Sequence, residues 1–395
     1  MSYPHTSPPR KIYEKEKEIQ KIQSQRDDLI RKFLKNYVYD DSNNLRSGVQ
    51  IKNYSDTARY EGELTPQGLK QGRGIYHYPN GDKYLGEWNA DHFNGQGVYV
   101  FALGERYEGE LINGKKHGKG IYYYLNGNIY QGEWTNDKKN GHGEYIYNTT
   151  GETYEGEWKD GERNGLGKYY FCYGDRYDGM WLKGMKTGKG VLDYASGARY
   201  EGSWDKDKAN GKGIMHYANG DQYDGDWLDG AKHGYGTYFF HDGARYEGEW
   251  SMDDKNGKGK FVHPNGDKYE GEWKDGEKSG HGVYFYANGD RYEGDWKNDK
   301  RNGFGTLIMA NGDKYTGEWV DGEKNGRGTY EFENGDYYEG YWIAGKRHGK
   351  GRYMWTNGES YVGEWRNDKM NGRGEFITVD GVSFQGDFKD DKKID

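Results

Sequence analysis

The residues that could do chemistry in this chain lie in short polar motifs whose spacing does not fit an enzyme site. The segment 276–282, GEKSGHG, has the glycines and the lysine (Lys278) of a phosphate-binding loop. It does not satisfy G-x-x-x-x-G-K-[ST], and no strand-to-helix transition follows. The run 205–211 has the carboxylates of a calcium loop with one residue too many, and His216 stands where a late Glu ligand is needed. We therefore expect neither nucleotide binding nor tight calcium binding.

Paired carboxylates and histidines recur at a fixed interval, which favours a structural role. Glu270 and Glu272 form a pair of the kind that does acid–base work, but similar pairs occur in nearly every segment of the chain. His117, His233 and His348 are separated by many residues of a repeating pattern, so they cannot share a metal ion. The sequence predicts no catalytic residue, no cofactor and no metal site, and therefore a protein that is not an enzyme.

The composition is that of a folded chain whose core is aromatic. The 395 residues have a mean hydropathy of -1.27 and only 32% hydrophobic residues, values that lean toward disorder. The net charge is only -8, however, and 13 Trp, 40 Tyr and 13 Phe match the 66 glycines in number. Each buried ring removes roughly 150–250 Å² from water, so these rings can supply the core that aliphatic residues do not.

Features of targeting and redox chemistry point to the cytosol or to a cytoskeletal assembly within it. Cys172 is the single cysteine, so no intramolecular disulfide framework can form. The first residues carry no apolar signal segment, no stretch of about 18 apolar residues occurs, and Ser2 does not fit N-myristoylation. We expect a cytoplasmic protein.

The pattern Tyr-x-Gly-x-Trp repeats along most of the chain. Its fifteen anchor residues are Tyr60, Tyr84, Tyr107, Tyr130, Tyr154, Tyr177, Tyr200, Tyr223, Tyr246, Tyr269, Tyr292, Tyr315, Tyr338, Tyr361 and, in degenerate form, Phe384. Twelve of the fourteen steps are 23 residues long, and the steps from Tyr60 and Tyr130 are 24. A fixed period in this range indicates a solenoid or another repeat array.

Each unit predicts a β-hairpin. Counting the anchor as position 0, glycine is at +2, usually Trp at +4, glycine again at +11 and +13, and aromatic or large apolar residues at +15 and +17. Side chains two apart share one face of a strand, so both strands place rings and glycines on a common face. The other face carries position +1, +3, +14 and +16 residues. Asn-Gly at +19 and +20, as in 287–290, suits a type I′ turn. The predicted fold is all-β: an elongated single-layer antiparallel meander of about fifteen stacked hairpins.

Residues 269–296, YEGEWKDGEKSGHGVYFYANGDRYEGDW, resemble the membrane occupation and recognition nexus (MORN) repeat, whose pattern is YxGxWxxGxxxGxGxxxxxxG. The resemblance covers roughly residues 54–390. Leu64 and Leu111 replace the tryptophan, and a half-unit from Phe384 ends the pattern, so we expect it to cap the array.

The resemblance implies a grooved sheet that acts as a scaffold. Similar arrays occur in radial spoke head proteins of cilia, in cytoskeletal scaffolds of apicomplexans and trypanosomes, in junctophilins, and beside plant phosphoinositide kinases. The uninterrupted array with a short charged helix is most similar to a radial spoke head subunit of the ciliary axoneme. Two alternatives remain open: a peripheral membrane or phosphoinositide-binding module, and a basal or cortical cytoskeletal scaffold that homodimerises. Nucleic-acid binding is not expected, because no concentrated basic patch exists.

The two ends of the chain differ from the array. We divide the chain into a tail (1–8), a charged amphipathic helix (9–39), a linker with a partial strand (40–53), the repeat array (54–390) and a C-terminal tail (391–395). Strong helix formers in 9–39 carry a heptad-like apolar stripe. This helix either docks onto another protein or packs on its own sheet. The stripe consists of Ile12, Ile19, Ile22, Leu29 and Phe33.

Two surfaces are candidates for binding. We expect partner proteins to contact the aromatic face near the middle of the array, since aromatic residues dominate binding hot spots. The chosen residues are Tyr223, Trp227, Tyr246, Trp250, Tyr269, Trp273, Tyr284 and Tyr286. Basic residues at +8 to +10 predict either a solvated edge or a weak anionic-lipid surface. They are Lys115, Lys116, Lys138, Lys139, Lys232, Lys255, Lys278, Lys300, Arg301, Lys324, Lys346, Arg347 and Lys369.

Overall fold

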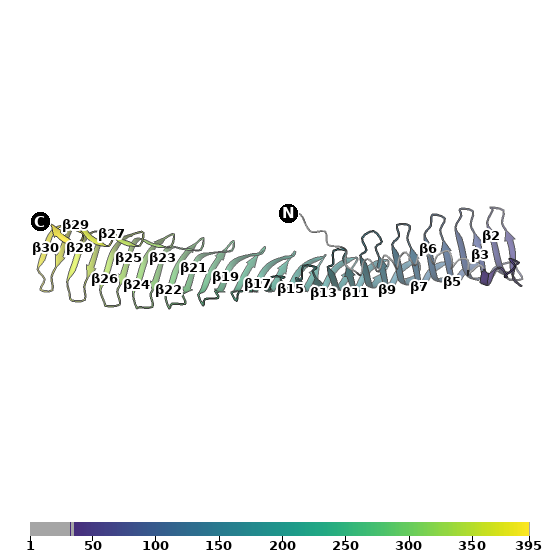
Figure 1. Cartoon of the computed structure of the whole chain (residues 1–395), viewed down its shortest axis with the longest axis horizontal. Helices are drawn as coiled ribbons and strands as arrows, with labels where there is room; N and C mark the ends of the chain where they lie inside the picture. Colours follow the sequence, from purple (N-terminus) through teal and green to yellow (C-terminus); the bar gives the residue numbers. More distant parts are fainter. Residues whose placement is uncertain (1–31, 33–34, 395) are drawn as a thin grey trace. The chain divides into compact units, whose positions relative to one another are not determined.

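The computed structural model describes Lys32 and residues 35–394, which form 31 antiparallel strands. The chain divides into two compact units, Met1–Ala209 and Asn210–Asp395, which are called the first unit and the second unit below. A single hairpin of the repeating pattern is called a repeat unit. Within each unit, strands lie side by side in chain order (Figure 1). The prediction of an antiparallel meander of repeated hairpins is confirmed. Residues 35–37 are helical, whereas most of the expected helix 9–39 lies outside the described residues.

The strands of the first unit are short and regular. They are β1 (Gln50–Asn53), β2 (Arg59–Leu64), β3 (Lys70–His77), β4 (Lys83–Asn89), β5 (His92–Val100), β6 (Arg106–Ile112), β7 (Lys115–Tyr123), β8 (Ile129–Thr135), β9 (Lys138–Ile146), β10 (Thr153–Lys159), β11 (Glu162–Tyr170), β12 (Arg176–Leu182), β13 (Met185–Asp193) and β14 (Arg199–Asp205), and β15 (Lys208–His216) begins at the boundary.

The second unit continues the same alternation of seven- and nine-residue strands. They are β16 (Gln222–Leu228), β17 (Ala231–Phe239), β18 (Arg245–Ser251), β19 (Asp254–Val262), β20 (Lys268–Lys274), β21 (Glu277–Phe285), β22 (Arg291–Lys297), β23 (Lys300–Ile308), β24 (Lys314–Val320), β25 (Glu323–Glu331), β26 (Tyr337–Ile343), β27 (Lys346–Met354), β28 (Ser360–Arg366), β29 (Lys369–Ile377), β30 (Ser383–Lys389) and β31 (Lys392–Ile394). Residues 391–395 were expected to be a tail, but β31 pairs with β30.

The anchor tyrosine explains why glycine recurs at +2 and +13 of each repeat unit. In the hairpin β20–β21, Gly271 lies opposite Gly282, and the ring of Tyr269 lies over both. A Cβ added at Gly282 would stand 2.4 Å from the Tyr269 hydroxyl oxygen, and one added at Gly271 would stand at the same distance. The Tyr269 hydroxyl donates to the carbonyl of Glu272 at 2.9 Å. Glycine is therefore required at +2 and +13 because the ring lies flat on the backbone.

The tryptophan at +4 links each repeat unit to the repeat unit before it. The indole N–H of Trp273 donates to the carbonyl of Gly259, 3.2 Å away. Its ring stands edge-on between Tyr246 (centroids 5.3 Å apart) and Tyr269 (5.2 Å). The same contacts recur in the repeats that have tryptophan at +4, where tyrosine and tryptophan form an alternating row of T-shaped contacts, a geometry that aromatic rings favour.

The turns show that the predicted role of Asn-Gly at +19 and +20 was wrong. The type I′ turn lies instead at +6 and +7, where Asp275 (φ 49°) and Gly276 (φ 85°) form a two-residue loop. At 287–290 only Gly289 has positive φ (96°), and its N–H donates to the carbonyl of Tyr286. This is a type I turn followed by a glycine bulge, the usual three-residue hairpin. Asn288 acts through its side chain, which accepts from the N–H of Asp290 at 3.0 Å.

Carboxylates join successive turns along this edge. The Oδ1 atom of Asp267 accepts from the N–H of Ala287 (2.7 Å) and its Oδ2 accepts from the hydroxyl of Tyr284 (2.9 Å), both in the next unit. Although burial opposes it, the Ala287 N–H dominates and holds the pKa of the Asp267 carboxyl below its usual range, with further help from Tyr284 and Asn265. Most turns with Asp or Glu at this position are thus bonded to the next turn by a charged acceptor, the stronger class of hydrogen bond. The neutral Asn128 accepts the equivalent bond in one repeat, and Ala198 and Ala244 have no side-chain acceptor there.

Candidate functional site

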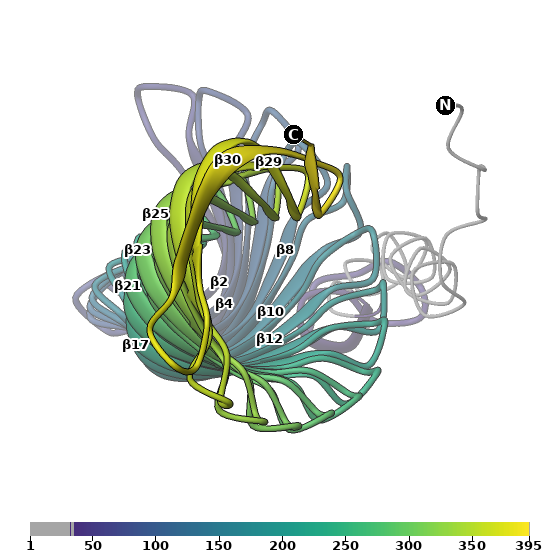
Figure 2. The same cartoon turned by 90° about the vertical axis from the view of Figure 1, so that its left-hand side faces the viewer.

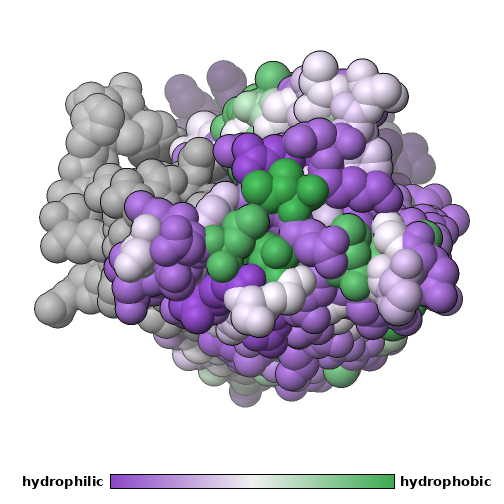
Figure 3. Space-filling view, turned by 90° about the vertical axis from the view of Figure 1, so that its right-hand side faces the viewer, coloured by the Kyte–Doolittle hydropathy of each residue, from purple (hydrophilic) through white to green (hydrophobic). Residues whose placement is uncertain are grey.

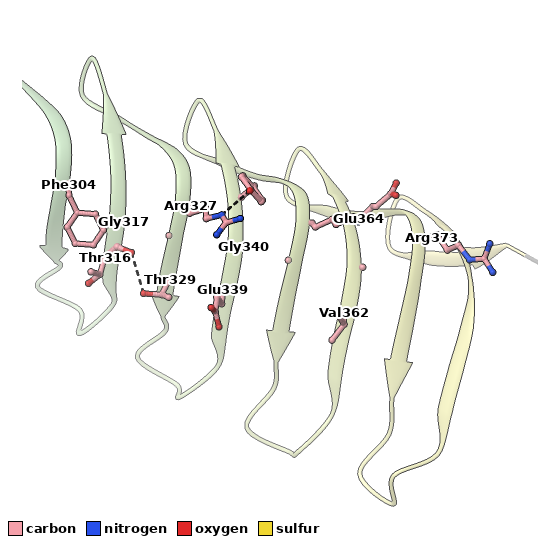
Figure 4. Close-up of a pocket in the computed structure, with 15 residues that line it drawn as sticks. Phe304, Thr316, Gly317, Arg327, Thr329, Glu339, Gly340, Val362, Glu364 and Arg373 are labelled. Atoms are coloured by element: carbon pink, nitrogen blue, oxygen red, sulfur yellow. Dashed lines mark hydrogen bonds between the residues drawn. The ribbon is translucent and has the colours of Figure 1, made fainter.

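The face opposite the ring row is hollowed, and it is the candidate site. In the second unit a groove of about 800 Å³ is lined by side chains at positions +1, +3, +12 and +14 and by backbone at the glycines. Figure 2 shows end-on that the strands of this unit, including β21, β23 and β25, are bowed. Thr316, Thr329, Glu339 and Val362 project along this face from β24, β25, β26 and β28 (Figure 4). The groove therefore runs across the strands.

A bulge in every second strand shapes this face. Between the pairs Gly271↔Gly282 and Glu272↔Ser279 the register shifts, and Gly280 adopts φ 58°. The carboxylate at +3 fills the space beside the bulge and binds the backbone there: Glu318 accepts from the N–H of Arg327 at 3.0 Å. The recurring glutamate at +3 thus has a structural role, as its repetition indicated, and the side chain at +12 is turned onto the groove face.

The second-unit groove combines exposed apolar side chains with a basic row. Phe304 is 58% exposed, and Tyr341 and Val362 are also exposed. Arg327 lies among them with Lys350 and Arg373, three basic residues at position +12 that line the groove with two acidic residues. The Nε atom of Arg327 donates to the hydroxyl of Tyr341 at 2.9 Å, which holds the two side chains together (Figure 4). An acidic segment with apolar side chains is the complementary ligand.

The first unit has an equivalent groove of opposite character. It has a volume of about 870 Å³ and is lined by five glutamates against one lysine and one histidine. The glutamates are Glu108, Glu110, Glu133, Glu144 and Glu155, and the other two are Lys119 and His142. Arg106 lies next to this row and pairs with Glu108 at 2.6 Å. The groove is acidic, so a basic ligand is favoured there.

At the start of the array, the chain itself covers the same face. Val38 is fully buried against Ile75 and Leu85, with Tyr37, Tyr39, Val49 and Val100 packed around them. The Tyr39 hydroxyl donates to Glu61, and the guanidinium of Arg73 lies over the ring of Tyr37 at 4.1 Å. Ile75, Leu85 and Glu61 belong to the face that forms the grooves. In this unit, then, the groove face already holds an irregular peptide segment.

The structure places the predicted aromatic contacts in the core. Seven of the eight chosen residues are buried, Tyr223, Tyr246 and Tyr269 completely, and Tyr286 is half-buried. The buried set is completed by Trp227, Trp250, Trp273 and Tyr284. Burial raises the pKa of each of these tyrosines. Partner binding by these residues stays a prediction, but the exposed groove lies on the other face. The apolar stripe from Ile12 to Phe33 lies outside the described residues.

The basic edge is also smaller than the sequence indicated. Eight of its thirteen residues, those at +9, lie over the rings: Lys116, Lys139, Lys232, Lys255, Lys278, Arg301, Lys324 and Arg347. The Nζ atom of Lys255 is 4.0 Å from the ring centroid of Trp273, and burial lowers the pKa of this lysine to about 8. The remaining five, at +8, are exposed: Lys115, Lys138, Lys300, Lys346 and Lys369. Position +9 is two and four residues before the glycines at +11 and +13. This even spacing could have assigned the +9 side chains to the ring face.

A family model of the MORN repeat matches fourteen successive stretches between residues 67 and 383. The chain belongs to the MORN repeat family. This repeat is generally a non-enzymatic module, consistent with a scaffold or with protein or membrane binding. Within Lys32 and residues 35–394, no group of three or more His, Cys, Asp and Glu side chains could hold a metal ion. In the same described part of the chain, no helix is long and apolar enough to cross a membrane.

Comparisons with other proteins add little to the family. No curated protein matches this MORN chain. The TCP10 domain of Danio rerio CPAP, solved with a peptide of Danio rerio STIL, is 12% identical, covers 63% of this chain and 96% of its own, and has a TM-score of 0.19. Virginiamycin B lyase from Staphylococcus aureus is 12% identical, covers 67% of this chain and 92% of its own, and has a TM-score of 0.12. Likenesses this low carry no argument about function.

Proposed function

We propose that this MORN protein is a non-enzymatic structural scaffold that binds segments of partner proteins on its groove face. The observation that carries the proposal is the packing of residues 37–39 and Val49 on that face in the first unit. Val38 is fully buried there, so a segment without repeat character can anchor a side chain on this face, although residues 41–48 stay exposed. The second-unit groove has the same repeat positions, and in the described structure its apolar side chains are exposed.

The chemistry of the second-unit groove defines the partner segment. Apolar side chains would cover Phe304 and Val362, and carboxylates would pair with the basic row at Arg327, Lys350 and Arg373. Such charges steer encounter and fix register, whereas the buried apolar anchors supply most of the affinity. An extended or helical acidic segment meets both requirements.

The proposed setting is the ciliary axoneme, in the manner of a radial spoke head subunit. Its support is the resemblance of the uninterrupted array to those proteins. The axonemal setting would fail if the endogenous protein, localised by fluorescence microscopy in ciliated cells, were excluded from the axoneme. A basal or cortical scaffold that homodimerises remains the alternative, and light scattering of the purified chain distinguishes a dimer from a monomer.

The binding proposal is tested with charge and apolar variants of the full chain. Proximity labelling in cells would compare wild type with Phe304→Asp/Lys350→Glu and with the control Lys346→Glu, whose side chain is exposed at +8. We expect one set of neighbours to be lost in the groove variant and retained in the control. Equal neighbour lists in all three would refute binding through this groove.

A membrane-binding role is a second candidate because five exposed lysines line the edge at +8. Each basic residue near an anionic surface contributes about 1 kcal/mol. Sedimentation with neutral and with phosphoinositide-containing vesicles, at low and high salt, tests it. Equal and low sedimentation with both kinds of vesicle would eliminate this candidate, while loss of binding in a Lys115→Glu/Lys138→Glu variant would support it.

A further inference from the structure

We propose that the acidic groove of the first unit is occupied by the chain's own basic segment, residues 9–34. This inference does not depend on partner binding in the second unit. The groove is lined by residues between Gln96 and Glu155. The proposal rests on three observations: the chain just after this segment already packs on the same face, the segment and the groove have opposite charge, and the segment is long enough to span the groove.

Continuity comes from the segment that already lies on the groove face. Residues 37–39 and Val49 pack on this face, where Val38 contacts Ile75 of β3 and Leu85 of β4. Arg46 fixes the start of this segment, since its guanidinium donates to the carbonyls of Lys35 (2.9 Å) and Tyr39 (3.0 Å). The chain before residue 35 therefore starts from a point that is anchored to the same face of the sheet as the acidic groove.

Charge favours this occupant. Residues 9–34 contain eight Lys or Arg and five Asp or Glu, a net charge of +3. The groove presents five glutamates, of which Glu133 and Glu155 are exposed, against one lysine and one histidine. The second-unit groove has three basic residues against two acidic ones, so the same segment is disfavoured there. Opposite potentials on the two surfaces select this pairing and suppress the other.

Apolar contacts and length also fit. Beyond the acidic row, Leu166 and Met180 are cross-strand neighbours on the groove face, and Leu166 is 60% exposed. The apolar stripe that includes Ile12, Ile19 and Ile22 offers side chains to cover them. From β4 to β10 the sheet extends about 29 Å at roughly 4.8 Å per strand, and 26 residues span about 39 Å even as a helix. The segment can therefore reach the whole groove.

The first measurement is zero-length carbodiimide cross-linking of the full chain, which joins lysine amines to carboxylates in direct contact. We expect links from Lys11, Lys15, Lys17 or Lys21 to the first-unit glutamates. Mixing isotopically labelled and unlabelled protein separates links within one chain from links between two. Links that are absent, that join two chains, or that lead to the second-unit groove would each overturn the proposal.

The second measurement is the rate at which trypsin cleaves the segment in the full chain. The variant Glu133→Gln/Glu155→Gln removes two exposed groove charges, and Glu364→Gln/Glu339→Gln removes charges from the same repeat positions in the second unit. We expect cleavage to rise about fivefold in the first variant, as loss of two partly exposed ion pairs implies, and to stay at the wild-type rate in the second. Equal rates in all three proteins would contradict the docking, provided that circular dichroism shows each to be folded.

Discussion

The contact between Tyr269 and its two glycines gives the most specific test of how the MORN unit is built. Replacing Gly282 by alanine places a methyl group 2.4 Å from the Tyr269 hydroxyl oxygen and 2.6 Å from its Cε2. The backbone of Gly282 does not have positive φ, so alanine is compatible with the strand and the conflict is with the ring alone. Because the ring is held between Trp273 and Trp296, it cannot shift without breaking both contacts.

The expected cost follows from displacing a buried aromatic side chain. Truncations of this kind cost about 3–5 kcal/mol, and we expect Gly282→Ala to fall in this range. Tyr269→Phe should cost only about 1 kcal/mol, since it removes the hydrogen bond to the Glu272 carbonyl and leaves the ring. Hydrogen exchange of β20 and β21 amides is the assay, because each unit contacts only its neighbours and opens locally.

A double-mutant cycle decides the cause. If the ring is the reason for the glycine, Gly282→Ala adds nothing in a Tyr269→Ala background, and the cycle gives a coupling of about 3 kcal/mol or more. Additive costs in the double variant would show that Gly282 is needed for another reason, and the description of the ring lying over the glycine pair would be wrong.

Three further results are expected. Trp273→Ala should lower the exchange protection of its own unit and of the preceding one by several kcal/mol, because it removes two ring contacts and the bond to Gly259; undiminished protease resistance would argue against a core role. Asp267→Asn should weaken the fall in the free energy of unfolding at low pH. A carboxyl with a lowered native pKa stabilises the fold above its unfolded pKa of about 4 and loses that contribution as the pH falls through the native value. An acid unfolding transition that is the same in wild type, Asp267→Asn and the control Asp275→Asn would refute the role of the Ala287 bond. Lys255→Met should cost less than about 1 kcal/mol in urea unfolding, whereas Lys255→Ala should cost more, since the stem covers Trp273; equal costs would show that the charge and not the packing matters.

The sequence predicted the hairpins because tyrosine, glycine and tryptophan two residues apart can share a face only in a strand. It did not predict which face is hollowed, since that depends on the bulge at Gly280 and on the carboxylate of Glu272 beside it. Neighbouring lysines such as Lys115 and Lys116 look equivalent in the sequence, yet one is exposed and the other lies over Trp134. Once the strand is known to begin at +8, the even spacing from +9 to +13 assigns Lys116 to the ring face and leaves Lys115, at +8, off that face.

The same limit applies to the aromatic residues chosen as binding contacts, which stay a prediction. Aromatic side chains such as Tyr246 and Trp250 suggest hot spots, but the sequence does not show whether neighbouring units cover them. The groove residues are less conspicuous, because Phe304 and Arg327 stand at position +12, which is most often lysine, histidine or glutamine and in single repeats leucine or tyrosine. At the end of the first unit, Figure 3 shows a mostly hydrophilic surface with small hydrophobic patches, so hydropathy alone does not mark a site there.

The bonds of Trp273 to the preceding unit and of Asp267 to the following one have a consequence for how the length of the chain can change. Excising residues 269–291 would bring Trp296 against Tyr246 and Lys255 in the same way that Trp273 meets them now. The junction would be chemically equivalent to the one removed, so recombination between repeats can shorten or extend the sheet in steps of 23 residues without disturbing any remaining unit.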